Sequence, residues 1–133
     1  MSAPQRFKAA VEADDIDAAL ATLSPDVVFH SPAVFHEYRG IESVGGLLRI
    51  VAQTFEDFRY TDTLSGDADA PVHALIFRAR VGERELEGMD LVRVGADGLI
   101  EDFTVMVRPA SGLMALAQAL GPKVEAAGIH HAG

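Results

Sequence analysis

Apolar and polar residues alternate along three consecutive stretches between residues 72 and 108, a pattern typical of β-strands. The breaks between these stretches contain glycine: Gly82-Glu83 separates the first two, and residues 95–98 (GADG) separate the second and third. Short breaks that contain glycine, placed between alternating stretches, predict β-hairpins. We therefore expect three antiparallel strands joined by two tight turns.

The first turn predicts how the first two strands pair. Two turn residues at 82–83 place Leu75 opposite Asp90 and Arg78 opposite Glu87, and oppositely charged residues that face each other across two strands stabilise the pair. A register that differed by one residue would turn Asp90 to the other face of the sheet. The prediction for Asp90 therefore depends on this turn.

The second turn extends the assignment to the third strand. With four loop residues at 95–98, Asp90 is expected opposite Phe103. Because side chains alternate between the faces of a sheet, one face is apolar except near Asp90. Its members are His73, Leu75, Phe77, Leu86, Asp90, Phe103, Val105 and Val107. A buried carboxylate without a partner is costly, so Asp90 is a candidate functional residue.

Before the sheet, apolar residues recur every three or four positions, which predicts helices. The three stripes are Phe7, Ala10 and Val11; Ile16, Ala19, Leu20 and Leu23; and Ile41, Val44, Leu48, Val51 and Phe55. The first helix is expected to begin at Ser2-Ala3-Pro4. The second is expected to be capped by Asp14 or Asp15 and to end at Ser24-Pro25.

The other segments predict short strands, loops and one more helix. The strands and loops are expected at 27–31, 33–40, 58–64 and 65–71. A last helix is expected to begin at Pro109 and to end at Gly121-Pro122, a pair typical of a helix terminus. The sequence after Pro122, which includes His130-His131, has little pattern, and we interpret it as frayed polar sequence.

Composition narrows the class of protein. A chain of 133 residues is expected to form one domain, spanning 1–133. No apolar run approaches the roughly 18 residues of a membrane span, and the N-terminus lacks the pattern of a signal peptide, so we expect a cytoplasmic protein without a membrane partner. A net charge of −9 argues against nucleic acid, and zero cysteines exclude thiol chemistry. No metal-ligand spacing or cofactor fingerprint is present, so neither metal nor cofactor is expected.

Five short motifs follow one another in a recognisable order: 15–18 (DIDA), 25–32 (PDVVFHSP), 40–42 (GIE), 89–94 (MDLVRV) and 97–101 (DGLIE). Together with the order of elements, they resemble the nuclear transport factor 2-like (cystatin-like) superfamily, which includes ketosteroid isomerases and SnoaL-like polyketide cyclases. The resemblance implies an α+β fold in which N-terminal helices pack on a curved antiparallel sheet that forms a cone-shaped pocket, followed by a C-terminal helix.

The resemblance also implies roles for individual residues. Asp90 falls where ketosteroid isomerases have a protonated aspartic acid that donates a hydrogen bond to the developing oxyanion. Phe7 stands at the position of their tyrosine, and Ser31 at that of their proton-shuttling aspartate. Val105 stands where SnoaL-like cyclases have a catalytic aspartate. We therefore do not expect a steroid isomerase or a standard cyclase.

Histidine is the other residue that could take part in acid–base chemistry. His73 is expected on the same face as Asp90 and diagonal to it, where the two could exchange a proton; the alternative is a histidine at the rim of the strand without a chemical role. For Asp90 the alternative is a structural carboxylate bonded to backbone or water. His30 is expected on the opposite face from its neighbours. The residues expected to line the pocket are Phe7, Phe29, Ser31, Tyr38, Leu75, Phe77, Phe103 and Val105.

Two functions remain open at this stage. One is a cofactor-free acid–base isomerase, cyclase or hydrolase that acts on a small, mostly apolar molecule through Asp90. The other is a non-catalytic ligand-binding or assembly domain that has lost the catalytic set.

The other face of the sheet predicts a partner of a different kind. It has an apolar centre that consists of Ala74, Ile76, Met89, Leu91 and Met106. Charges of both signs surround this centre, as they surround a self-complementary interface, so we expect a homodimer through this face. In the alternative arrangement, the C-terminal helix covers this face.

Overall fold

Six strands and four helices make up the part of the chain that the computed structural model describes, residues 1–65 and 71–132. The helices are α1 (Ala3–Glu12), α2 (Ile16–Leu20), α3 (Ile41–Thr54) and α4 (Ala110–Ala126). The strands are β1 (Leu23–His30), β2 (Tyr38–Arg39), β3 (Glu56–Ser65), β4 (Val72–Val81), β5 (Arg84–Val94) and β6 (Ile100–Arg108). The strands form one sheet in the order β2-β1-β6-β5-β4-β3. The loop predicted at 65–71 lies almost entirely outside the described residues.

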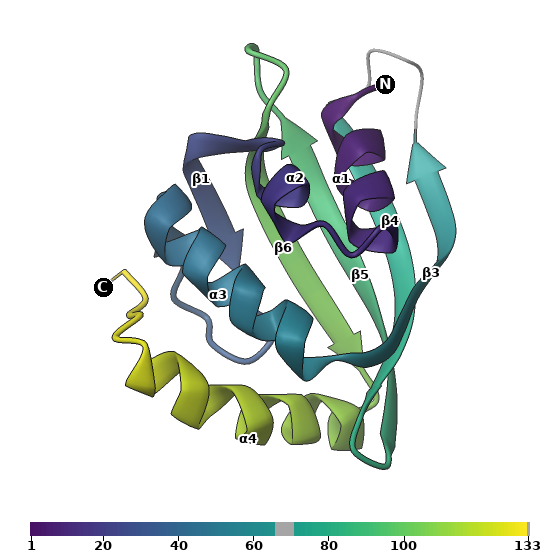
Figure 1. The fold of residues 1–133 in the computed structure, drawn as a ribbon, viewed down its shortest axis with the longest axis vertical. Coiled ribbons are helices and arrows are strands. Elements are labelled where there is room, and N and C mark those ends of the chain that lie inside the picture. Colours follow the sequence, from purple (N-terminus) through teal and green to yellow (C-terminus); the bar gives the residue numbers. More distant parts are fainter. Residues whose placement is uncertain (66–70, 133) are drawn as a thin grey trace.

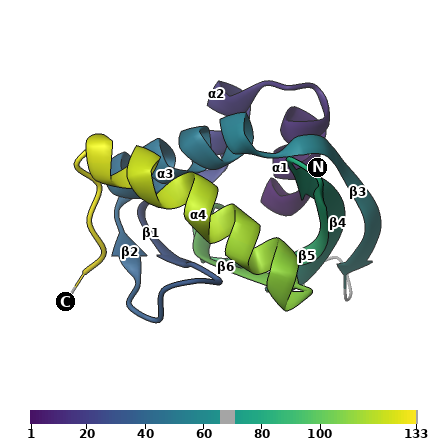
Figure 2. The ribbon, with the colours of Figure 1, turned by 90° about the horizontal axis from the view of Figure 1, so that it is seen from below.

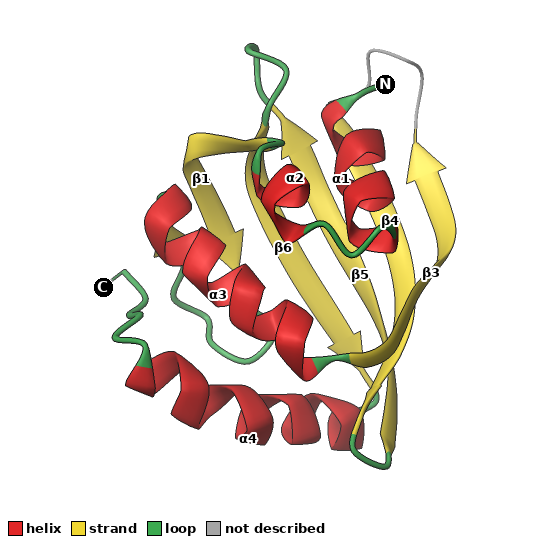
Figure 3. Ribbon diagram, viewed as in Figure 1, coloured by secondary structure: helices red, strands yellow, loops and turns green. Residues whose placement is uncertain are grey.

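The helices lie on one side of a curved sheet, as the α+β prediction requires (Figures 1 and 3). α1, α2 and α3 cover the inner face, and α4 crosses the end of the sheet against β4, β5 and β6 and beside α3 (Figure 2). The core fills the space between these layers. Its largest fully buried side chains include Phe77, Phe103, Leu75 and Ile100. No described helix is long and apolar enough to cross a membrane.

The sequence explains where the first two helices begin. Ser2 Oγ accepts a hydrogen bond from the backbone N–H of Gln5, and Gln5 Oε1 accepts one from the backbone N–H of Ser2, which completes a capping box at α1. Asp15 caps α2, because its Oδ1 accepts a hydrogen bond from the N–H of Ala18 at 3.1 Å. The choice left open between Asp14 and Asp15 is therefore settled for Asp15.

The prediction for the end of α2 was wrong. The helix ends at Leu20, and Leu23, which has helical spacing, is the first residue of β1. The cause is long-range pairing, because Leu23 lies beside Ile100 of β6. Pro25 is tolerated inside β1 because it lies where the register with β6 is irregular, and no ladder hydrogen bond is required of it there.

Two features of the sheet were not predicted. β1 runs parallel to β6, so the sheet is antiparallel everywhere except at this pair. Within the segment 33–40, expected to be a loop, Tyr38 and Arg39 form the short strand β2, which pairs with Phe29 and Val28. The parallel pair depends on contacts between residues far apart in the sequence, and the two residues of β2 are too few to show an alternating pattern.

The register between β4 and β5 is the predicted one: Leu75 lies opposite Asp90 and Arg78 opposite Glu87. The register between β5 and β6 was wrong by two residues, because Asp90 lies opposite Val105 and not Phe103.

The loop that connects β5 and β6 explains this shift. The N–H of Gly95 donates to the carbonyl of Leu99 at 2.8 Å, Gly98 adopts a φ of +82°, and the ladder is irregular next to Arg93. A shift of two residues leaves every side chain on its predicted face, so Asp90 still faces the helices.

The last helix continues past Gly121-Pro122, where it was expected to stop, and α4 ends at Ala126. A proline inside a helix removes a hydrogen bond and costs about 3 kcal/mol. Two apolar residues beyond it, Val124 and Ile129, pack against the main core and offset this cost. The segment that follows was expected to be frayed, yet His131 stacks on His36 with 5.1 Å between ring centroids.

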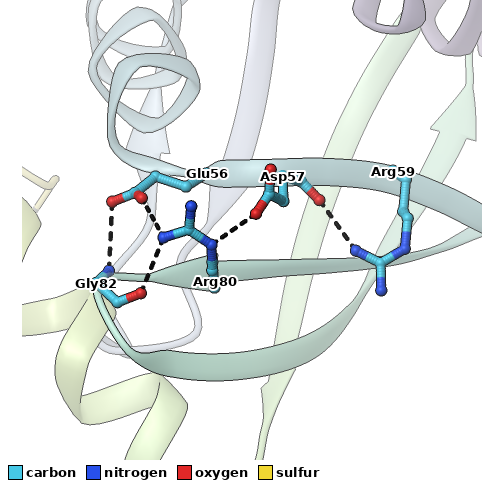
Figure 4. Close-up of polar contacts among 5 residues, drawn as sticks. All are labelled: Glu56, Asp57, Arg59, Arg80 and Gly82. Atoms are coloured by element: carbon cyan, nitrogen blue, oxygen red, sulfur yellow. Dashed lines mark hydrogen bonds and ion pairs between the residues drawn. The ribbon is translucent and has the colours of Figure 1, made fainter.

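Charged side chains connect the start of β3 to the β4–β5 hairpin (Figure 4). Arg80 lies opposite Glu85, but its ion pairs are with Asp57 (Nε to Oδ2, 2.6 Å) and with Glu56. Its Nη1 also donates to the carbonyl of Gly82 at 3.0 Å. These exposed pairs fix where β3 meets the hairpin more than they add to stability.

The outer face of the sheet has no described element over it. Because α4 packs on the inner side, the expectation that this helix might cover the outer face is wrong. The apolar centre of that face is partly accessible to solvent, and Met106 is 49% exposed. Arg78 and Glu87 form one ion pair on this face (3.4 Å), and Glu87 also pairs with Arg108 (3.1 Å).

Candidate functional site

A cavity of about 370 Å³ lies between the helices and the inner face of the sheet. Its walls come from every helix and from strands β1, β3, β4, β5 and β6, and they are mostly aromatic and aliphatic. Phe103 contributes to the wall and contacts Phe7 and Phe29 through ring centroids 5.2 and 5.6 Å away. A cavity of this size and character suits a small, mostly apolar molecule.

Most of the residues expected to line the pocket do line this cavity. These residues are Phe7, Phe29, Ser31, Phe77, Phe103 and Val105, together with Asp90. Tyr38 and Leu75 are buried but are not among the lining residues; Tyr38 packs against Phe29, and Leu75 is 1% exposed in the core. Phe7 and Ser31 face the cavity, as the resemblance implied for the positions of the missing tyrosine and aspartate.

Asp90 is positioned by the centre of β5 and is 6% exposed. The hydroxyl of Tyr60, on β3, donates a hydrogen bond to Asp90 Oδ2 at 2.9 Å. The other carboxyl oxygen, Oδ1, has no hydrogen-bond partner among the described residues, and the side chain lines the cavity. One oxygen is thus held by the protein, and the other is available to a ligand.

The environment shifts the protonation of both groups. Burial raises the pKa of Asp90 to about 7, although the hydrogen bond from Tyr60 acts in the opposite direction. Burial and the neighbouring charge of Asp90 raise the pKa of Tyr60 well above its usual value. Near neutral pH, Tyr60 is therefore a permanent hydrogen-bond donor, while Asp90 is present in both the neutral and the ionised form.

Tyr60 is the residue of the candidate site that the sequence analysis missed. It lies opposite Phe77, and its hydroxyl reaches across β4 to Asp90 on the next strand. Gly88 makes room for the ring of Phe77 on the strand between them, because a Cβ at Gly88 would lie 2.2 Å from Phe77 Cζ. The usable signal was a tyrosine in a predicted strand, since a buried tyrosine hydroxyl requires a partner. The position of that strand beside β4 was not predicted.

The two histidines have different environments. His73 is 6% exposed on the predicted face, but its Nδ1 lies 2.9 Å from Ser65 Oγ, and it is not among the cavity-lining residues. The hydrogen bond of Asp90 goes to Tyr60, so a catalytic role for His73 stays a prediction. His30 lies on the outer face, as expected, with Nε2 2.8 Å from Asp102 Oδ1. Within the described ranges, no cluster of three or more His, Cys, Asp or Glu side chains is placed to hold a metal ion.

Comparison with known proteins gives one family and many similar structures. A model of the SnoaL-like domain matches residues 5–103. The structure of a steroid delta-isomerase from Pseudomonas aeruginosa is 40% identical with a TM-score of 0.86, over 94% of this chain and 90% of the other. A conserved bacterial protein with a cystatin-like fold from Silicibacter pomeroyi is 32% identical with a TM-score of 0.85, over 92% and 85%.

More distant structures share the fold. A candidate polyketide cyclase from Pseudomonas putida is 18% identical with a TM-score of 0.67, over 84% of this chain and 95% of the other. A search of curated protein sequences finds no match.

Proposed function

The chain belongs to the SnoaL-like domain family, and we propose that it binds a small, mostly apolar molecule in the cavity and exchanges a proton with it through Asp90. One observation carries this proposal. A buried aspartic acid lines an apolar cavity, with one carboxyl oxygen held by Tyr60 and the other without a hydrogen-bond partner among the described residues. An ionisable group is costly to bury, so this arrangement is typical of a site with a chemical role.

The chemistry follows from the pKa of Asp90. A group with a pKa of about 7 is effective as an acid and as a base at neutral pH. The ionised form can accept a proton from a carbon next to a carbonyl group, and the neutral form can return it to another atom of the same molecule. The double bond of the ligand moves, and the ligand gains or loses neither atoms nor electrons. The reaction is therefore an isomerisation. Tyr60 keeps the carboxyl group oriented throughout, because its own pKa is raised.

The similar protein from Pseudomonas aeruginosa, a steroid delta-isomerase at 40% identity, supports an isomerase class. The residues that line the cavity argue against the set of catalytic groups that the resemblance to ketosteroid isomerases implied. Phe7 has no hydroxyl group, and Ser31 cannot act as a base at neutral pH. In this chain Asp90 would therefore have to transfer the proton without the second carboxylate.

Two substitutions test the proposal. Asp90→Asn keeps the shape of the side chain but cannot exchange a proton, so any turnover of a β,γ-unsaturated ketone should fall by about 100-fold or more. Tyr60→Phe leaves Asp90 able to exchange a proton but removes the hydrogen bond that orients its carboxyl group. Turnover should therefore fall by less than in Asp90→Asn. The control is Asp26→Asn, on an exposed carboxylate outside the cavity. Turnover that is equal in Asp90→Asn and in the unmodified protein would refute the acid–base role.

The second candidate function is a binding domain without catalysis. It is favoured by Ser31, whose Oγ accepts a hydrogen bond from the N–H of Ala33 at 3.1 Å at the position where the resemblance implies a base. In that case the neutral form of Asp90 would donate a hydrogen bond to a ligand oxygen. If the protein binds the ketone without turning it over, and Asp90→Asn weakens that binding, the binding function is supported over the isomerase function.

We also propose that two copies of the chain associate through the outer face of the sheet. The four described helices lie on or beside the inner face, so the apolar centre around Met89 and Met106 is left for another molecule. Ion pairs such as Arg78–Glu87 border it with both signs of charge, which suits a two-fold interface. This assembly leaves the cavity accessible, since the cavity lies on the opposite face.

A further inference from the structure

The cavity wall is exposed to solvent at the C-terminal end of α1 and the turn into α2, and we refer to this part of the wall as the mouth. Three acidic residues of this segment, Glu12, Asp14 and Asp15, line the cavity and are exposed to solvent. Asp90 belongs to the buried part of the same wall. A ligand that contacts Asp90 and extends to the mouth would place its other end near these carboxylates.

Within the part of the chain that the structure describes, no basic side chain lines this cavity. Among the described residues that line it, the ionisable side chains are Glu12, Asp14, Asp15, Tyr60 and Asp90, and none is a lysine, arginine or histidine. The last turn of α1 also has no basic residue, and the carbonyl end of a helix adds partial negative charge. The nearest bases along α1 bond elsewhere: Arg6 to the carbonyl of Met1 and Lys8 to Thr63 Oγ1.

These carboxylates differ in their structural roles, and Asp14 adopts a φ of +57°, a conformation in which aspartate is favoured. Asp15 caps α2. Neither Glu12 nor Asp14 makes a side-chain hydrogen bond or ion pair with any described residue. Burial and Asp90 are the larger causes of the raised pKa of Tyr60, and the charge of Glu12 adds to them. A carboxylate of the mouth therefore acts on the Tyr60–Asp90 pair.

We infer that the ligand carries a positive charge, such as a protonated amine, at the end in the mouth, and an uncharged oxygen at the end against Asp90. The inference rests on the proposed function, since it uses the free oxygen of Asp90 to fix one end of the ligand. Ligands with a carboxylate or phosphate group are disfavoured by the same charges. The substrate class is thus an apolar body with a carbonyl or hydroxyl group at one end and an amine at the other.

Three probes with the same apolar body test this inference. 2-Acetylnaphthalene derivatives bear a hydroxymethyl, an aminomethyl or a carboxylate group at position 6, and their binding is measured by calorimetry at pH 6 and low salt. At pH 6 Asp90 is mostly neutral because its pKa is about 7, so the comparison isolates the mouth. Exposed ion pairs contribute modestly, so we expect the ammonium probe to bind about tenfold more tightly than the carboxylate probe.

A pair of variants assigns the effect to the mouth. Glu12→Gln combined with Asp14→Asn should remove most of the preference, and asparagine suits the φ of +57° at position 14. Glu83→Gln removes one charge in the exposed β4–β5 turn and should leave the preference unchanged.

The outcomes separate this inference from the proposed function. If the ammonium and carboxylate probes bind equally, or if the preference survives the double variant, the inference is wrong while the function stands. If the neutral probe does not bind at all, both are wrong. If the preference for the ammonium probe disappears in the double variant and persists in Glu83→Gln, the inference is supported.

Discussion

Replacing Asp90 with asparagine should change how the stability of the protein depends on pH. Burial raises the pKa of Asp90 to about 7, whereas an aspartate in an unfolded chain titrates near ~3.9. The folded protein therefore holds this proton more tightly than the unfolded chain does. The stabilisation from this group is complete below about pH 4 and is lost as the pH rises toward 7. A pKa difference of about 3 corresponds to about 4 kcal/mol of unfolding free energy.

Asparagine has a similar shape but no charge, so the variant should not lose stability in this way as the pH rises. The assay is urea unfolding of both proteins between pH 4 and pH 8, with the difference in unfolding free energy plotted against pH. We expect the variant to gain stability relative to the unmodified protein by up to about 4 kcal/mol as the pH rises over this range. Asp26→Asn, on an exposed carboxylate, should give a nearly flat difference, within about 0.5 kcal/mol. An equally flat difference for Asp90→Asn would refute the reasoning.

Three further substitutions test other parts of the structure. Tyr60→Phe removes the hydrogen bond that lowers the pKa of Asp90, so that pKa should rise by about one or more, measured by NMR titration; an unchanged value would show that the bond does not form in solution. Gly88→Ala places a Cβ 2.2 Å from the ring of Phe77, so thermal unfolding should show a loss of about 1–3 kcal/mol, and an unchanged melting temperature would contradict the close packing. Met89→Glu puts a charge at the centre of the outer face and should convert a dimer to a monomer in sedimentation at micromolar concentration; a monomeric unmodified protein, or an unaffected dimer, would defeat the proposed assembly.

Local sequence signals predicted the part of the fold in which the pairing partners are close along the chain. The two-residue turn at 82–83 was sufficient to pair Leu75 with Asp90, and the capping residues located the starts of α1 and α2. The predicted face of Asp90 was right even though its partner on β6 was not, because the error was two residues and faces alternate with period two.

Contacts between distant segments could not be predicted in this way. No local pattern indicates that β1 lies parallel to β6, or that packing of Val124 carries α4 past Pro122. The hydrogen bond between Tyr60 and Asp90 spans three strands, and it depends on the position of β3 at the edge of the sheet. The sequence therefore predicted one member of the candidate site and missed the residue that holds it.

The pKa of Asp90 is the quantity on which this account depends most directly. It can be measured by ¹³C NMR titration of the aspartate carboxyl carbons, with the Asp90 resonance assigned by its absence in Asp90→Asn. We predict a midpoint of about 7, because the side chain is buried in an apolar cavity and, among the described residues, its one hydrogen-bond donor is Tyr60. A midpoint near the ordinary ~3.9 would mean that Asp90 is ionised at neutral pH and exposed to water, and would contradict its role as the proton donor and acceptor of this site.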